Sequence, residues 1–105
     1  MSAVIIPWQS AIAFQQQVTL GGRLYSLRFR FNGESDHWSM DISDRNREPL
    51  VTGIRVVKGQ ALLYACRALG LPRGDFFVIG NGMPTRDNMG DGLQLIYLEL
   101  PDDAV

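Results

Sequence analysis

The feature that most constrains this chain is a regular alternation of apolar and polar residues in two neighbouring segments. Every second residue from Tyr25 to Phe31 is apolar, and the same holds from Trp38 to Ile42. A period of two is typical of a β-strand that buries one face. Residues 32–36 between the two segments are polar and contain a glycine, as a loop requires. The two segments therefore predict an antiparallel hairpin within a β-meander.

Both faces of this hairpin favour the same register. If its loop is centred near Glu34 and Ser35, Arg28 lies opposite Asp41 on the polar face. On the apolar face the expected pairs are Phe31 with Trp38, Phe29 with Met40 and Leu27 with Ile42. A slip by one residue would turn every side chain to the wrong face, so the pattern specifies this register strongly.

Further strands are predicted at residues 14–20, 50–57, 76–79 and 93–100. The last of these is apolar at nearly every position, which favours a central place in a sheet. Gly21 and Gly22 form a two-residue hairpin signal, and Gly53 predicts a bulge or a close packing contact. Residues 60–69 are the helix candidate, because Leu62, Leu63, Cys66 and Leu69 form an apolar stripe and Gly70 follows it. Cys66 is expected to be a buried, inert thiol on that stripe.

The expected fold is mainly β, a small antiparallel β-barrel or sandwich of six to seven strands with one short helix at about residues 60–69. With 105 residues, 46% of them hydrophobic and 20% charged, the chain is expected to form a single domain, 1–105. Within it we expect an N-terminal arm at 1–10 and a long loop at 80–92. We expect no targeting segment, because the apolar run before Pro7 is only four residues long, and we expect no membrane partner.

The titratable residues argue against most enzymes. The chain has one His, one Cys and a formal net charge of −1, which also excludes a Cys-based zinc site and gives little support for a nucleic-acid binder. A catalytic His37 would need a nucleophile and an orienting carboxylate, and neither is evident. Residues 87–92 resemble a calcium loop but place Met89 at its third position, and Gly80–Gly82 lacks a complete phosphate-loop pattern. We therefore expect no catalytic residues, no cofactor and no bound metal.

Candidate interface residues remain. Arg is nine of the ten cations, and its planar guanidinium suits ion pairs and interfaces, although a genome rich in arginine codons would give the same excess. Arg28 and Arg30 lie on the face opposite the aromatic residues and form a solvated or subunit-facing layer. Large apolar residues and Arg outside the strands are typical interface anchors, although Trp8 could instead cap the core. The candidate interface comprises Trp8, Arg28, Arg30, Met83, Pro84, Arg86 and Met89.

Several segments, taken in order, carry a family resemblance. They are Leu20–Gly22, Tyr25–Asn32, Trp38–Asp44 and Pro49–Gly59, followed by Leu62, Leu63 and Tyr64. In this order the chain resembles the baseplate plug proteins of contractile-tailed bacteriophages, from about Ile6 to Leu100. It departs from the family pattern at Gln60 and in the less acidic loop at 80–90, so no specific contact is carried over.

The resemblance implies a structural, non-enzymatic plug in a phage tail baseplate, at the axial tube and hub near the spike. It further implies synthesis in the host cytoplasm, a place in the virion, and tube, hub and spike proteins as partners, with copies of itself as further partners. The alternative, from the residues, is a small β-barrel module that binds a ligand or nucleic acid. Such a module would be monomeric, with an oligonucleotide affinity that depends on salt.

Overall fold

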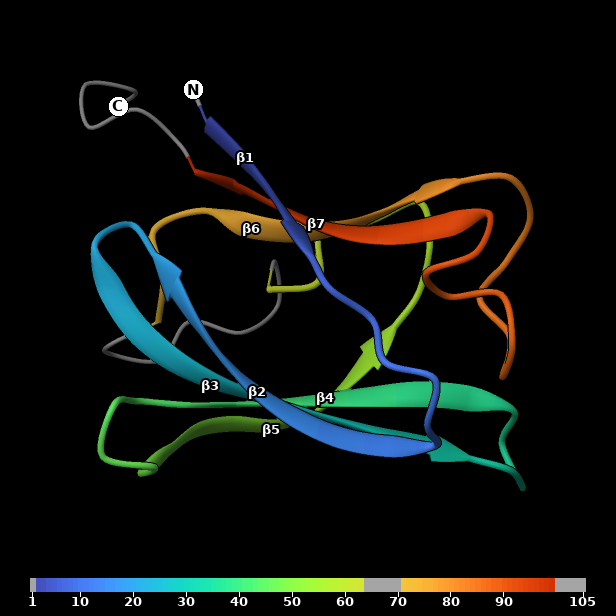
Figure 1. Cartoon of the computed structure of the whole chain (residues 1–105), viewed down its shortest axis with the longest axis horizontal. Coiled ribbons are helices and arrows are strands. Elements are labelled where there is room, and N and C mark those ends of the chain that lie inside the picture. The colour runs from blue at the N-terminus through green and yellow to red at the C-terminus, as the bar shows by residue number, and fades with distance from the viewer. Residues whose placement is uncertain (1, 64–70, 100–105) are drawn as a thin grey trace.

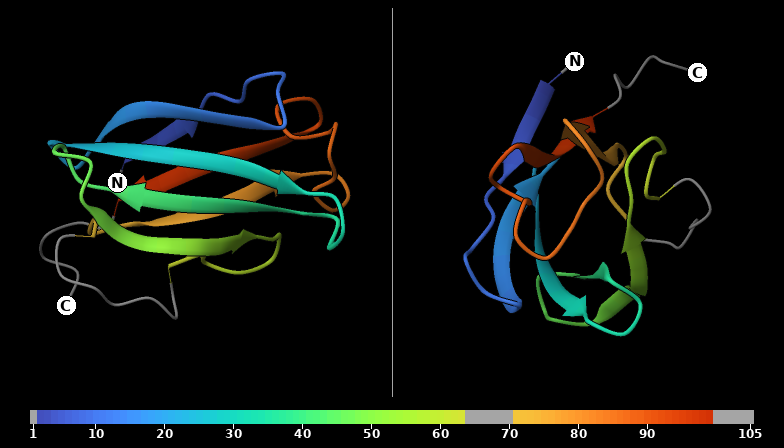
Figure 2. Two further views of the ribbon diagram at one scale, coloured as in Figure 1. Left: turned by 90° about the horizontal axis from the view of Figure 1, so that it is seen from below. Right: turned by 90° about the vertical axis from the view of Figure 1, so that its right-hand side faces the viewer.

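A computed structural model describes residues 2–63 and 71–99, and in these residues the chain forms seven strands in two antiparallel sheets (Figure 1). One sheet has the order β1-β7-β6 and the other the order β2-β3-β4-β5. The strands are β1 (Ser2–Ile6), β2 (Ala13–Leu20), β3 (Arg23–Asn32), β4 (His37–Ser43), β5 (Pro49–Val56), β6 (Asp75–Gly80) and β7 (Leu93–Glu99). The sheets lie face to face as two layers and do not close into a barrel (Figure 2). Of the two expected architectures, the chain adopts the sandwich.

The register predicted for the central hairpin is confirmed. In the pairing of β3 with β4, Phe31 faces Trp38, Phe29 faces Met40, and Arg28 faces Asp41. The apolar set of each strand points into the sandwich, where Phe29, Trp38 and Met40 are at most 1% exposed. The expected central position of the last strand is also confirmed, because β7 lies between β1 and β6.

The core fills the space between the two sheets. Each strand of the hairpin contributes alternate side chains, and Phe76, Leu95 and Tyr97 close the core from the opposite sheet. Burial of these large apolar groups is the main stabilising contribution in a fold of this size. The Tyr97 hydroxyl lies in this core and accepts a 2.8 Å hydrogen bond from the Gly74 amide, so its polar atom is satisfied.

Two segments differ from the sequence-based expectation. Half of the expected N-terminal arm, residues 2–6, forms β1, which pairs with β7 from Ser2–Glu99 to Ile6–Leu95. Five apolar or small residues before a proline carry no alternation of their own, so only the pairing with β7 reveals the strand. Of the expected helix at 60–69, residues 60–63 have no helical conformation, and residues 64–69, including Cys66, lie outside the described residues.

Gly53 forms the irregularity that its place in a strand predicts. Its φ is +73°, in the left-handed region that favours glycine, and the pairing of β4 with β5 shifts register on either side of Ile42. The Gly53 amide donates a 2.8 Å hydrogen bond to the Asp41 carboxylate in place of a ladder bond. This is the behaviour of a β-bulge.

Candidate functional site

Trp8 packs against the aromatic residues at one end of the sandwich. Its ring lies 4.6 Å from that of Phe29, 4.9 Å from that of Trp38 and 5.2 Å from that of Phe14, centroid to centroid. Two of these contacts are edge-to-face, the geometry that aromatic quadrupoles favour. Trp8 is half-buried, so it caps the core with one side and remains accessible on the other.

The segment between β6 and β7 folds back onto Trp8. Met89 is 5% exposed and belongs to the core, and Gly90 lies so close to Trp8 that a Cβ on Gly90 would be 2.9 Å from the Trp8 Cβ. The φ of Gly90 is +83°, which again favours glycine. A small residue in the left-handed region is therefore needed where the two segments meet.

Asn88 holds this segment in place. Its side-chain oxygen accepts a 2.7 Å hydrogen bond from the Thr85 amide, and its side-chain nitrogen donates a 2.8 Å bond to the Met83 carbonyl. The Thr85 carbonyl in turn accepts a 2.9 Å hydrogen bond from Nε1 of Trp38 in β4. The long loop expected at 80–92 is thus tied by specific hydrogen bonds to itself and to the core.

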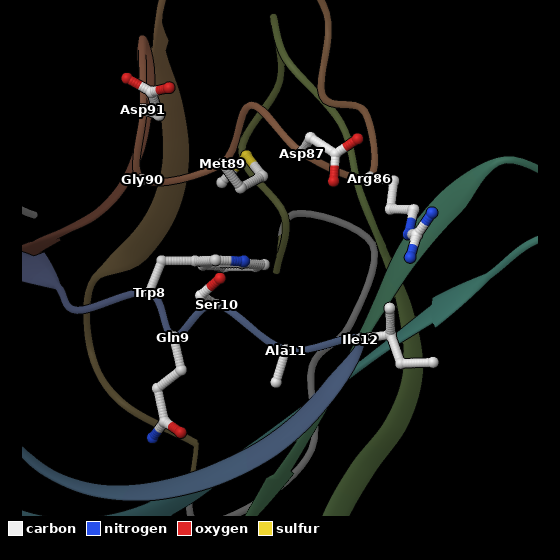
Figure 3. Close-up of a pocket in the computed structure, with 10 residues that line it drawn as sticks. All are labelled: Trp8, Gln9, Ser10, Ala11, Ile12, Arg86, Asp87, Met89, Gly90 and Asp91. Atoms are coloured by element: carbon white, nitrogen blue, oxygen red, sulfur yellow. The ribbon is translucent and has the colours of Figure 1, made fainter.

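A groove of about 410 Å³ lies between the Trp8–Ile12 segment and the 86–91 loop (Figure 3). Trp8 and Met89 form its apolar part, and Ile12, which is 57% exposed, lies on the same side as Arg86. Asp91 stands at the other end of the groove from Arg86. An apolar floor with a charged rim is the usual anatomy of a protein interface.

The groove brings together three of the predicted interface residues, Trp8, Arg86 and Met89, from two segments far apart in the sequence. Met83 and Pro84 lie in the same loop but do not line the groove, and Met83 is 60% exposed. Ile12 was not predicted from the sequence to belong to this surface. The one available sign was that Ile12 is an apolar residue immediately before a strand.

The remaining two predicted residues, Arg28 and Arg30, lie on the outer face of the four-stranded sheet. Arg30 forms an ion pair with Asp41, with 3.4 Å between Nη2 and Oδ2, although Arg28 is the residue directly opposite Asp41. Arg55 was not singled out from the sequence, yet it belongs to the same face, because it pairs in register with Ser39, the partner of Arg30. A row of guanidinium groups therefore crosses β3 to β5 near the end of the sandwich that holds the groove.

In the described part of the chain, the residues considered for catalysis or for metal binding do not form a cluster. His37 is half-buried at the start of β4, and no hydrogen bond joins its Nδ1 to another group in the described part of the chain. Among residues 2–63 and 71–99 no three His, Cys, Asp or Glu side chains are grouped as metal ligands would be. The same residues include no helix long and apolar enough to span a membrane.

A comparison with known protein families identifies the family of this chain. A family model described as "Cyanophage baseplate Pam3 plug gp18" matches residues 3–101. The chain belongs to this family. A search of curated proteins gives no match.

Membership confirms the expected resemblance to phage baseplate plugs and gives the chain a structural role in the tail baseplate of a bacteriophage. A baseplate plug associates with other proteins of the baseplate and tail and is located in the virion tail. The match extends over β1 to β7, so it covers both the groove at the Trp8 end of the sandwich and the arginine row on its outer face.

Proposed function

We propose that this plug occupies the axial region of the baseplate, where tail tube and hub meet near the spike, and that it acts there by protein packing without catalysis. Synthesised in the host cytoplasm, it would join the assembling tail as a single domain, with tube, hub or spike proteins as its neighbours. The observation that carries the proposal is the groove beside Trp8, because its exposed Ile12 and Arg86 stand beside an apolar floor on a rigid frame.

Three properties of the groove suit it to hold a neighbouring protein. Its floor is part of the core, through Trp8 and Met89, so a docked side chain would meet an ordered surface. Its loop is fixed by the Asn88 hydrogen bonds, which lowers the conformational entropy lost on binding. Its rim carries Arg86 and Asp87 at one end and Asp91 at the other, and these charges can orient a partner.

The arginine row supplies a second contact surface on the same frame. Arg28 and Arg55 are exposed and form no ion pair with a described residue, whereas Arg30 is held by Asp41. Free guanidinium groups on a flat sheet face favour a partner surface that carries carboxylates. The proposal therefore assigns the row to orientation and the groove to anchoring.

The test is incorporation of groove variants into tails. Ile12→Lys combined with Arg86→Glu should leave the fold intact, because both side chains are exposed, and should strongly reduce the plug content of purified tails measured by mass spectrometry. The matched control is Arg45→Glu, an exposed charge reversal in the turn at the opposite end of β4. Wild-type incorporation of the groove variant would overturn the assignment of the groove, and absence of the wild-type protein from purified tails would overturn the structural role.

A further inference from the structure

A sandwich of two open sheets has four edge strands, and here these are β1 and β6 in one sheet and β2 and β5 in the other. An edge strand presents unpaired backbone N–H and C=O groups, and stable proteins usually protect such edges with charges, prolines, bulges or covering segments. The four edges of this chain differ in this protection, and the difference points to one of them as a site of strand addition.

Two edges are protected by covering contacts or by the strand itself. On β6 the Phe76 carbonyl accepts a 3.0 Å hydrogen bond from the Leu62 amide, and the Gly80 carbonyl accepts a hydrogen bond from Nζ of Lys58. On β5 the first residue is Pro49, which has no amide hydrogen, and the bulge at Gly53 breaks the regular spacing.

The β2 edge is protected by its polar side chains and by the segment before it. Gln15 and Gln17 face outward, and Gln16 Nε2 donates a 2.8 Å hydrogen bond to the Pro7 carbonyl, which ties β2 to the chain that leaves β1. At the far end of β2, Gly21 lies against the carboxylate of Glu99.

β1 has none of the features that protect the other three edges. Its sequence, SAVII, contains no charge, no glycine and no proline, and it pairs with β7 residue for residue without a bulge. Val4 is 38% exposed and Ile5 is 58% exposed, so apolar side chains are accessible on both faces of the strand. In the described part of the chain β1 has one neighbouring strand, β7, and its other side has none (Figure 2).

The outer face of this sheet continues the apolar surface that starts at β1. In register, Ile5 lies opposite Ile96, and Ile96 lies opposite Phe77, so one apolar row crosses all three strands. Ile79, 44% exposed, extends this surface along β6. A strand added at β1 would therefore gain main-chain hydrogen bonds and side-chain contacts along this row.

We propose that β1 of one copy pairs antiparallel with β1 of a second copy, about a two-fold axis through Val4. An added strand would meet apolar side chains on both faces of β1, and a second copy of β1, which is uncharged and exposes Val4 and Ile5 on opposite faces, matches this surface. The two-fold axis places Ile5 against Ala3 of the partner subunit, a large side chain beside a small one, and brings no like charges together. The two three-stranded sheets then form one continuous sheet, and their apolar outer rows join.

The test is the oligomeric state of the purified wild-type chain, measured by sedimentation velocity over a range of concentrations. The wild-type chain is expected to form a dimer, and Ile5→Lys is expected to weaken the dimer about tenfold or more because a charge on an edge strand opposes pairing. The matched control is Ile79→Lys, the same substitution on the other edge strand of the same sheet, which should dimerise like the wild type. A wild-type chain that stays monomeric, or a control weakened as much as Ile5→Lys, would overturn the proposal.

A cross-link checks the register independently of dimer strength. In a chain with Cys66→Ser, Val4→Cys places two thiols beside each other at the two-fold axis, so a short bis-maleimide should yield a covalent dimer. Ile79→Cys in the same background should yield far less. Equal cross-linking of both variants would contradict pairing through β1. Because these measurements use the isolated chain, their failure would leave the baseplate role untouched, and loss of tail incorporation would leave the dimer untouched.

Discussion

Gly90 lies directly against Trp8, and a Cβ built on Gly90 would stand 2.9 Å from the Trp8 Cβ. This contact joins the segment after β1 to the segment before β7, and it forms one wall of the groove. The backbone of Gly90 also has a φ of +83°. Both the space and the conformation therefore require glycine at this position.

We predict that Gly90→Ala destabilises the protein by about 2 kcal/mol, because alanine at positive φ is strained and its methyl group collides with Trp8. Urea unfolding followed by tryptophan fluorescence measures this change. Gly82→Ala is the matched control, since Gly82 lies in the same loop at φ +87° with nothing within 4 Å of its added Cβ. The control isolates the backbone cost, and equal losses for both variants would show that the Trp8 contact is unimportant.

Truncation of two methionines in the same loop should destabilise the protein to very different extents. Met89 is 5% exposed within the core, so Met89→Ala should cost about 3 kcal/mol of unfolding free energy. Met83 is 60% exposed, so Met83→Ala should change the unfolding free energy by less than about 0.5 kcal/mol. Thermal and urea unfolding of the two variants test this directly. A large loss for Met83→Ala would mean that its side chain packs more tightly than its exposure indicates.

Asp41 should contribute more to stability than either arginine near it. Its Oδ1 accepts the Gly53 amide hydrogen bond at 2.8 Å, whereas its ion pair with Arg30 is 3.4 Å long and the Arg30 side chain is 51% exposed. Asp41→Ala is therefore expected to cost about 1 kcal/mol, and Arg30→Ala less than about 0.5 kcal/mol. Asp41→Asn keeps an oxygen for Gly53 and should lie near the wild type. The measurement is the urea midpoint at constant slope.

Arg28 is expected to contribute nothing to stability, although it lies directly opposite Asp41 in the sheet. Arg28 is the register partner of Asp41, but the ion pair runs diagonally to Arg30. Arg28→Ala should therefore leave the unfolding free energy unchanged. A loss equal to that of Asp41→Ala would show instead that the directly opposed pair is the one that stabilises the sheet.

The strands that could be predicted from the sequence are those in which one face carries apolar residues and the other carries polar residues. From Tyr25 to Phe31 in β3 and throughout β4, apolar and polar residues alternate strictly, so the pattern specifies strand, face and register together. β1 has no such alternation, because Ala3, Val4 and Ile5 are all small or apolar, and its identity depends on pairing with β7. Tertiary pairing of this kind leaves no local signal.

The groove could be predicted only in part. Trp8, Arg86 and Met89 were singled out as large apolar or cationic residues outside the strands, and the structure brings them together. The parts played by Asn88 and Gly90 depend on which segments meet in space, and spacing along the chain does not show that. The four glycines and the proline of residues 80–92 predict a loop, but they do not show which of its groups are hydrogen-bonded.

Tyr97 is expected to make the stability of the protein depend on pH in the alkaline range. Burial raises the pKa of Tyr97 above its ordinary value of 10.0, and the hydrogen bond from Gly74 opposes this only in part. The folded state thus holds the phenolic proton more tightly than the unfolded state does. The stability that this supplies is complete below about pH 10 and is lost as the pH rises through the folded pKa, by up to about 1.4 kcal/mol per pH unit.

Unfolding free energies measured between about pH 8 and pH 11 should therefore fall more steeply for the wild type than for Tyr97→Phe. The variant loses the bond to Gly74 and should start about 1 kcal/mol lower at neutral pH, but it has no phenol to ionise at this position. The difference between the two curves removes the contribution of the other tyrosines. Parallel curves over the alkaline range would contradict the raised pKa, because a phenol that titrates equally in both states cannot change the slope.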